Sequence, residues 1–290
     1  MRRPGLRLLT VALALAGAAL LTGCGEQKTD ETATDDKGSG PRPHSTPHIP
    51  SPRGSSPAPG RDPERGQDQL PVPSLVGQTS TPDPKLPAPV VNMDIAHDSE
   101  TKGRTVNLTI DDGPDPVWTP KILKILRDND AKAVFCMVGP QAEAHPDLVQ
   151  RVVAEGHRLC DHSVAHDTGM DHRSRDYQKD QILRAAAQIE KASGGVKPLY
   201  YRAPGGAFTP YSRQIAAAAG MRPVGWNVDS KDFELPGAEA ILRTVKGELA
   251  NGPTVLFHDG GGDRSQTAAA MKKLLPWLSG KGYAFSFPVR

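Results

Sequence analysis

The chain has 290 residues, and its 35 basic and 33 acidic side chains leave a formal net charge of +2. The basic residues form no stripe along the sequence, which argues against a nucleic-acid-binding protein. Once a targeting segment and a proline-rich segment are set aside, about 200 residues remain. That is enough for one domain with a full hydrophobic core.

The N-terminus has the features of an export signal. A basic start containing Arg2-Arg3 precedes an uncharged, mostly apolar run at residues 8–22, which is too short to span a membrane. Residues 21–24, Leu-Thr-Gly-Cys, resemble the lipobox of bacterial lipoproteins. The resemblance implies a signal peptide over residues 1–23 and a protein anchored by lipidated Cys24 at the outer face of the cell membrane. An ordinary signal peptide is the alternative, and the export route, general or twin-arginine, stays open.

Residues 24–89 are predicted to form a disordered tether. They hold half of the chain's 28 prolines and no aromatic residue, so they bury too little apolar surface to offset the entropy lost on ordering. Such a tether would let a folded domain at residues 90–290 reach away from the membrane and into a cell wall. His44 and His48 lie in this segment at i, i+4 spacing, but Pro47 forbids a helix there. They show that His-x-x-x-His alone is poor evidence for a metal site.

Strand-like and helix-like patterns alternate from residue 105 onward. Strands are expected near residues 105–110, 132–138, 157–160, 198–201, 222–228, 253–257 and 283–287. Helices are expected near residues 119–128, 146–155, 176–191, 209–220, 238–250 and 265–278. Strands that alternate with helices indicate a parallel α/β sheet, and seven of them favour a (β/α) barrel over an open sheet. No Gly-x-Gly-x-x-Gly motif follows the first expected strand, so the sequence lacks the fingerprint of a dinucleotide-binding fold.

Cys136 and Cys160 each lie in a strand-like run. Two cysteines in an exported domain can form a disulfide. A free thiol buried in an apolar strand is equally ordinary. The sequence therefore leaves their pairing open.

Chemically active residue types recur where the expected strands end. In a parallel α/β barrel, functional residues gather at these ends. Taken singly, adjacent acids often form turns and a lone histidine is usually packed or exposed. Here five separate strand ends supply groups that fit a single active site, and this favours a functional role over those structural explanations. The residues are Asp111, Asp112, His162, His166, Arg202, Asp229, Asp232 and His258.

Asp112, His162 and His166 form a candidate metal site. Two imidazoles and one carboxylate suit Zn²⁺ and similar divalent ions, and the i, i+4 spacing of the histidines puts both rings on one face of a helical turn. Three protein ligands leave positions open for water and substrate, as in catalytic sites. The adjacent carboxylates of Asp111 and Asp112 would repel each other unless cations stood beside them, and a metal ion and Arg202 would meet that need.

The ordered segments resemble the five motifs of the NodB-like polysaccharide deacetylases, carbohydrate esterase family 4. The resemblance runs from about Thr105 to the C-terminus and implies a distorted (β/α)7-type barrel, the NodB homology domain. The matching segments are residues 109–113 (Thr-Ile-Asp-Asp-Gly), 162–166 (His-Ser-Val-Ala-His), 202–206 (Arg-Ala-Pro-Gly-Gly), 229–233 (Asp-Ser-Lys-Asp-Phe) and 256–258 (Leu-Phe-His).

The resemblance implies a role for each polar residue. Asp112, His162 and His166 would hold a divalent metal, with Zn²⁺ the first choice and Co²⁺ or another divalent ion as alternatives. Asp111 would be the general base, and Arg202 would position it and keep it ionised.

The general acid implied by the resemblance is His258, which must be protonated to donate to a leaving amine. Asp229 would raise the pKa of His258 by pairing with it. Asp232 is the weaker candidate for that support.

The resemblance also implies the residues around the substrate. The backbone N–H of Gly205 would bind the oxyanion, Leu256 and Phe233 would line the pocket for the acetyl methyl group, and Ser163 would orient the ligand turn. The chain departs from its relatives in three places. Asp161 stands where many have Asn, Gly205 where an aromatic is common, and Phe233 where Trp is common. These departures bear on the charge beside the metal ligands, on the width of the groove and on the size of the pocket wall, respectively.

The predicted function is a metal-dependent hydrolase that removes acetyl groups from N-acetylated sugars of an extracellular polysaccharide, either peptidoglycan or a chitin-type N-acetylglucosamine polymer. The lipid anchor and tether favour peptidoglycan, and the protein is expected to be a monomer. An O-acetyl (xylan) esterase could use the same machinery, because an ester only offers a better leaving group. A non-catalytic wall-binding protein could keep the same fold. A metal phosphoesterase fits poorly, since one three-ligand site lacks a paired metal.

Overall fold

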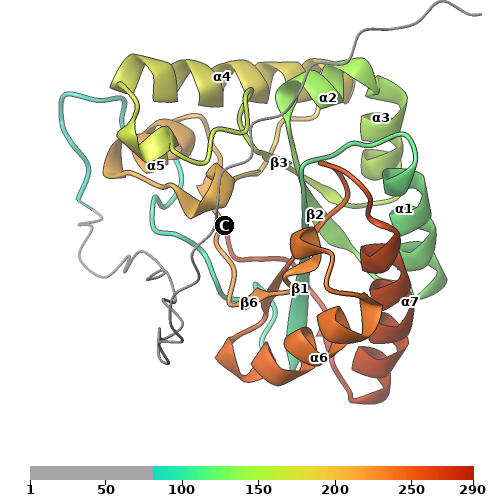
Figure 1. The fold of residues 1–290 in the computed structure, drawn as a ribbon. Helices are drawn as coiled ribbons and strands as arrows, with labels where there is room; N and C mark the ends of the chain where they lie inside the picture. Colours follow the sequence, from blue (N-terminus) through green and yellow to red (C-terminus); the bar gives the residue numbers. More distant parts are fainter. Residues whose placement is uncertain (1–80) are drawn as a thin grey trace, which may run out of the picture. The chain divides into compact units, whose positions relative to one another are not determined.

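The computed structural model of the protein describes residues 81–290 (Figure 1). The predicted signal peptide, Cys24, the His44–His48 pair and most of the predicted tether lie outside the described residues. Among the helices of residues 81–290, none combines the length and the apolar character needed to cross a membrane.

A parallel sheet forms the centre of the domain. Its strands are β1 (Thr105–Asp111), β2 (Ala133–Met137), β3 (Arg158–Asp161), β4 (Tyr200–Tyr201), β5 (Arg222–Pro223), β6 (Val228–Asp229), β7 (Thr254–His258) and β8 (Ala284–Phe285). Their order is β5-β4-β3-β2-β1-β7-β6, and β8 pairs with β1. The strands β5 and β6 are consecutive in the chain but lie at opposite edges, so the sheet curls into a barrel that stays open between them. The predicted distorted parallel barrel is confirmed.

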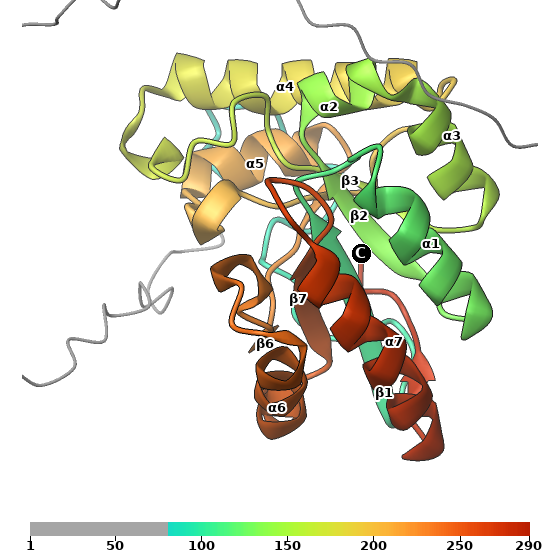
Figure 2. The ribbon, with the colours of Figure 1, turned by 45° about the vertical axis from the view of Figure 1, so that its right-hand side comes forward.

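Helices pack around the outside of the sheet (Figures 1 and 2). They are α1 (Trp118–Asp128), α2 (Gly139–Ala144), α3 (Pro146–Ala154), α4 (Arg175–Ala192), α5 (Pro210–Ala218), α6 (Ala238–Glu248) and α7 (Ser265–Gly280). All six predicted helices are present, and only the short α2 was not expected. Helix α4 begins one residue before the expected start, and Ser174 caps it by accepting the first-turn N–H of Tyr177.

The run predicted as one strand at residues 222–228 is interrupted. Strand β5 ends at Pro223, which has no N–H to donate to a ladder, and four residues separate it from the start of β6 at Val228. The chain near Ala96 pairs with this segment. The Ala96 N–H donates to the Pro223 carbonyl (2.8 Å), and the Gly225 N–H donates to the Ala96 carbonyl (2.9 Å). The carbonyls of Val224 and Gly225 accept hydrogen bonds from a side chain.

The main core lies between β1, β2 and β7 and the helices α1, α6 and α7. Leu108, Ile110, Phe135, Val255 and Phe257 are all buried there. Strands β2 and β7 read as nearly continuous apolar runs because both of their faces are covered. Strand β1 alternates instead, and its buried Asn107 and Thr109 are hydrogen-bonded to β7.

A disulfide joins Cys136 to Cys160, the pairing that the sequence left open. The two residues face each other in the register of β2 and β3 and are fully buried. The last residues of β2 also hold two predicted metal ligands through the backbone. The Asp112 N–H donates to the Cys136 carbonyl (3.1 Å), and the His162 N–H donates to the Met137 carbonyl (2.9 Å). The end of β2 is therefore a common support for both ligands.

Ordered contacts with the barrel begin before residue 90. The Asp83 N–H donates to Gln214 Oε1 of α5 (2.8 Å). Gln214 Nε2 donates in return to the carbonyls of Asp83 (2.9 Å) and Pro87 (3.2 Å). Residues 83–87 therefore pack on α5, although they belong to the segment predicted as tether.

Replacing both Cys136 and Cys160 by alanine is expected to lower the free energy of unfolding by about 3 kcal/mol. The reason is that the disulfide closes a loop between residues 24 apart in sequence, which restricts the unfolded chain. Urea unfolding followed by circular dichroism would measure the change. The reduced wild-type protein is the control, since it loses the cross-link without losing the packing of the side chains. A difference below about 1 kcal/mol between oxidised and reduced protein would contradict this stabilising role.

Candidate active site and metal centre

One pocket of about 380 Å³ lies where the strands of the barrel end. Strand β1 ends at Asp111, β7 ends at His258, and His162 and Arg202 directly follow β3 and β4. All ten residues predicted for catalysis, substrate contact and metal binding line this pocket, namely Asp111, Asp112, His162, His166, Arg202, Gly205, Asp229, Phe233, Leu256 and His258. The carboxyl ends of parallel strands have brought them together, as predicted.

Asp112, His162 and His166 place one potential ligand atom each within 4.8 Å of the others. Asp112 Oδ1 lies 3.1 Å from His166 Nε2 and 3.6 Å from His162 Nε2. This buried oxygen accepts no hydrogen bond within residues 81–290. His162 Nδ1 lies 2.8 Å from the Arg202 carbonyl, which can only accept, so Nδ1 carries the proton and the Nε2 lone pair faces Asp112.

These observations fit a divalent cation. Asp112 Oδ1, which accepts no hydrogen bond within residues 81–290, and the lone pair of His162 Nε2 face each other. The donor set of two nitrogens and one oxygen suits Zn²⁺ and similar divalent ions. Burial would raise the pKa of Asp112, but the imidazoles of His166 and His162 outweigh it and hold the pKa at about 2. The ligand carboxylate is therefore ionised and ready to bind a cation.

The backbone around the metal ligands is held in an uncommon conformation. Asp112 (φ 78°), Ser163 (φ 68°) and His166 (φ 48°) are among six non-glycine residues with positive φ in residues 81–290. Such strain concentrates at functional sites, where surrounding contacts must impose it. Here the His166 N–H donates to Ser163 Oγ (3.2 Å) and the Ser163 N–H donates to Asp161 Oδ1 (2.7 Å). This position matches the predicted role of Ser163 in orienting the ligand turn.

Asp161, noted above as a departure from the family pattern, is fully buried. Burial raises the pKa of its carboxyl well above the usual range. Its Oδ1 accepts the Ser163 N–H, a bond that an asparagine side chain could also accept. Burial therefore disfavours a negative charge at this position beside the metal ligands.

Asp111 and Arg202 form a buried ion pair beside the metal ligands. Arg202 is fully buried, and its Nη1 donates to Asp111 Oδ1 at 2.7 Å. Its remaining donors reach the carbonyls of Val224 (from Nε, 3.2 Å) and Gly225 (from Nη2, 2.8 Å). Asp111 Oδ2 lies 3.5 Å from His162 Nε2. One oxygen of Asp111 is thus committed to Arg202, and the other faces the candidate metal site.

His258 is paired with Asp232, not with Asp229. His258 Nδ1 lies 2.6 Å from Asp232 Oδ1, and Asp232 Oδ2 accepts the His258 N–H (2.9 Å) and the Thr267 hydroxyl (2.8 Å). Burial lowers the pKa of His258, but the hydrogen bond and charge of Asp232 outweigh it and raise the pKa above its ordinary value. The expected pairing with Asp229 was wrong, and the weaker candidate holds the position.

Asp229 instead pairs with Lys231, with 2.8 Å between its Oδ2 and Lys231 Nζ. The reason lies in the turn after β6. Lys231 adopts a left-handed conformation (φ 56°) before the 3₁₀ turn Asp232–Glu234, and this turn carries Asp232 beneath the end of β7. Asp229 stays on the rim of the same pocket.

Sequence reasoning missed several residues of the site. Thr168, Lys231, Ala203 and the half-buried Trp226 line the pocket without having been singled out. Asp259 was also missed. It is fully buried next to His258, and its N–H donates to the Asp111 carbonyl (3.0 Å). Burial raises the pKa of Asp259 to about 7. The sequence marks it only by its position after a histidine.

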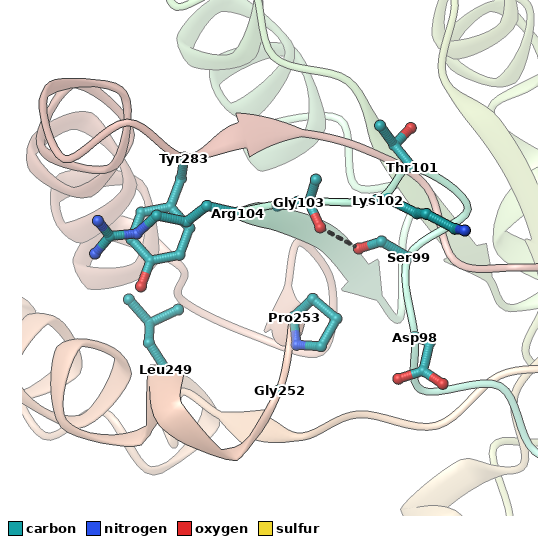
Figure 3. Close-up of a pocket in the computed structure, with 11 residues that line it drawn as sticks. Asp98, Ser99, Thr101, Lys102, Gly103, Arg104, Leu249, Gly252, Pro253 and Tyr283 are labelled. Carbon is teal, nitrogen blue, oxygen red and sulfur yellow. Dashed lines mark hydrogen bonds between the residues drawn. The ribbon is translucent and has the colours of Figure 1, made fainter.

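A second hollow of about 400 Å³ lies at the opposite ends of the strands (Figure 3). It is bounded by the residues that precede β1, by Gly252 and Pro253 before β7, and by Tyr283 before β8. The Arg104 guanidinium covers the Tyr283 ring at 4.3 Å from its centroid (Figure 3). No group of three potential metal ligands is found here, since the one such group in residues 81–290 belongs to the first pocket.

A three-ligand metal site between an acid–arginine pair and an acid–histidine pair, at the carboxyl ends of a parallel barrel, defines a metal-dependent hydrolase. A family profile described as polysaccharide deacetylase matches residues 98–224. A Bacillus cereus protein named peptidoglycan-N-acetylglucosamine deacetylase is 39% identical over 185 residues, covering 63% of this chain and 85% of its own.

Two further similarities agree with these matches. A chitooligosaccharide deacetylase of Sinorhizobium fredii is 34% identical over 195 residues, covering 64% of this chain and 90% of its own. The solved structure of a peptidoglycan N-acetylglucosamine deacetylase, in complex with a substituted benzamide, has a TM-score of 0.62 at 30% identity and covers 67% of this chain and 90% of its own. The chain belongs to the polysaccharide deacetylase family, carbohydrate esterase family 4.

Asp112→Ala is expected to weaken Zn²⁺ binding by a factor on the order of 100 or more, because it removes one of only three protein ligands. Competition with a chromophoric chelator would measure the affinity. Asp229→Asn is the matched control, since it changes an acid on the same pocket that lies outside the ligand cluster, and it should leave the affinity unchanged. Unaltered Zn²⁺ affinity in Asp112→Ala would rule out this ligand set.

Asp232→Asn is expected to lower the pKa of His258, because it replaces the charged partner of Nδ1 by a neutral one. NMR titration of the imidazole would measure the shift, and Asp229→Asn should leave the pKa unchanged. Because the pKa of His258 is raised in the folded protein, protonation of His258 stabilises the fold. This contribution is fully present below pH 6.5, the pKa of histidine in the unfolded chain, and is lost as the pH rises through the folded pKa. If Asp229→Asn shifted the titration and Asp232→Asn did not, the pairing described above would be wrong.

Proposed function

We propose that this protein is a metal-dependent N-deacetylase of an extracellular polysaccharide, with peptidoglycan as its first substrate and chitin-type N-acetylglucosamine oligomers as its second. The observation that carries the proposal is the pocket itself. A three-ligand metal site stands beside the Asp111–Arg202 pair, with His258 backed by Asp232 in the same pocket. The named activities of the B. cereus and S. fredii relatives support the substrate class.

The metal ligands are Asp112, His162 and His166, and we propose Zn²⁺ as the ion, with Co²⁺ or another divalent ion as alternatives. A divalent ion bound there would polarise the acetyl carbonyl and make a water molecule more acidic. The two-nitrogen, one-oxygen donor set supports Zn²⁺ in particular.

Asp111 is the general base of the proposed reaction. Its Oδ1 is bonded to Arg202, so Oδ2, which faces the metal ligands, is the oxygen that takes the proton of the attacking water. Arg202 orients this carboxylate and favours its anionic form. The backbone N–H of Gly205, in the wall of the same pocket, would donate to the oxyanion as the carbonyl carbon becomes tetrahedral.

His258 is the proposed general acid. Its Nδ1 is engaged by Asp232, which leaves Nε2 to donate a proton to the departing nitrogen. Leu256 and Phe233 lie in the pocket wall, and Phe233 packs edge-on against His258 with 5.5 Å between ring centroids. These apolar side chains would enclose the acetyl methyl group. The products are acetate and a free amine on the sugar.

The His258–Asp232 pair favours the deacetylase over an O-acetyl (xylan) esterase. An amine leaves only when it is protonated, whereas an alcohol is a better leaving group and depends less on a general acid. The raised pKa of His258 favours the protonated imidazole that the harder reaction needs. A non-catalytic wall-binding protein is the third possibility, and the complete set of catalytic groups argues against it.

We further propose that the protein is exported with residues 1–23 as its signal peptide and is anchored by lipidated Cys24 at the outer face of the cell membrane, facing the wall. The buried disulfide supports export, because such bonds persist mainly in oxidising compartments. The catalytic pocket is complete within one chain, which supports action as a monomer.

The proposal is tested by acetate release from peptidoglycan, N-acetylglucosamine oligomers and acetylated xylan, each with added Zn²⁺ or with chelator. We expect chelator-sensitive acetate from the N-acetylated polymers. Asp111→Asn should reduce turnover by a factor on the order of 100 to 10,000 without loss of Zn²⁺ binding, because it removes only the base. Acetate from xylan alone would identify an esterase, and Zn²⁺ binding without acetate from any polymer would favour the wall-binding protein.

A further inference from the structure

Two adjacent glycines in the pocket wall are covered by side chains from other parts of the chain. Gly205 (φ 60°) and Gly206 (φ 73°) both have positive φ. A side chain at position 205 would come within 3.1 Å of Thr168 Cβ and 3.2 Å of its methyl carbon Cγ2. One at position 206 would come within 3.1 Å of Trp226 Cη2. Thr168 and Trp226 therefore fill the space above the two glycines.

The turn that carries Thr168 is held by its neighbours. Asp167 Oδ1 accepts the Gly169 N–H (3.0 Å), and Asp167 Oδ2 accepts from Arg173 Nε (2.7 Å). These two bonds close the loop on both sides of Thr168. The side chain is therefore presented at the pocket from a fixed position, although the residue itself is exposed.

Most polar side chains of the pocket already have partners within the protein. Arg202 is bonded to Asp111, and Lys231 to Asp229. The metal ligands and His258 serve the proposed chemistry, and the indole N–H of Trp226 can donate but cannot accept. Thr168 is the one hydroxyl side chain among the residues that line this pocket, and its hydroxyl has no hydrogen-bond partner within residues 81–290.

A neutral hydroxyl that can both donate and accept is suited to a sugar hydroxyl. Its methyl group has a separate task, because Cγ2, together with Cβ, occupies the space that a side chain at position 205 would enter. We propose that Thr168 is a specificity-determining residue whose hydroxyl binds a hydroxyl group of the substrate's sugar while its methyl group sets the width of the pocket above Gly205. The inference rests on the proposed function for its substrate class.

Two substitutions separate the tasks of the Thr168 side chain. Thr168→Val keeps the shape and removes the hydroxyl, whereas Thr168→Ser keeps the hydroxyl and removes the methyl. With the N-acetylglucosamine tetramer, Thr168→Val should lower kcat/KM about tenfold, mainly through KM, which corresponds to one neutral hydrogen bond. Thr168→Ser should stay within about threefold of wild type. Thr101→Val, at an exposed threonine of the second hollow, is the matched control and should change nothing.

Binding of the same tetramer to the metal-free protein, followed by the fluorescence of Trp226, gives a readout that needs no turnover. Weaker binding by Thr168→Val but not by Thr168→Ser would support the inference even if no acetate were released. The absence of acetate release would count against the proposed function alone. Wild-type kcat/KM and binding in Thr168→Val would overturn the inference. Equal losses in both variants would also overturn it, since the hydroxyl would then not be the recognised group. Zn²⁺ affinity should be the same in all variants.

Discussion

The buried ion pair between Arg202 and Asp111 is the contact on which the site depends. A buried guanidinium is tolerated only when its donors are satisfied, and losing one partner of such a pair typically costs about 3–5 kcal/mol. Arg202 meets this demand with one carboxylate and two carbonyls, those of Val224 and Gly225. Both carbonyls belong to the segment that joins β5 to β6. This segment therefore supplies part of the support for a cation buried beside the proposed base.

The two acids that support proton transfer show how environment divides similar groups between opposite tasks. Asp111 lies against a permanent cation and faces the metal ligands, which suits the acceptance of a proton. Asp232 lies against an imidazole and raises its pKa, which suits the donation of one. Pairs of this kind, in a single pocket, are what a hydrolase of amides requires. The same reasoning explains why Asp161 and Asp259, buried without a cation, have raised pKa values.

The sequence predicted the parallel barrel and the metal ligands because both follow from simple regularities, namely alternating apolar patterns and the meeting of strand ends. It failed where the outcome depended on tertiary contacts. Asp229 and Asp232 are three residues apart at the same strand end, and only the left-handed Lys231 decides which reaches His258. The break at residues 224–227 resembles a strand in sequence because it contains Val224 and Trp226. The disulfide requires the register of β2 against β3, which composition does not contain.

The last two carbonyls of β2, those of Cys136 and Met137, hold the backbones of Asp112 and His162, which are fifty positions apart in the chain. The ligands can meet only after β1, β2 and β3 have paired in the correct register. A metal ion that binds this triad therefore binds the folded chain and not the unfolded one, and its binding free energy is added to the stability of the barrel. Metal binding and the pairing of the strands in register are in this way thermodynamically linked. The concentration of the free ion would set how far the equilibrium lies toward the folded protein.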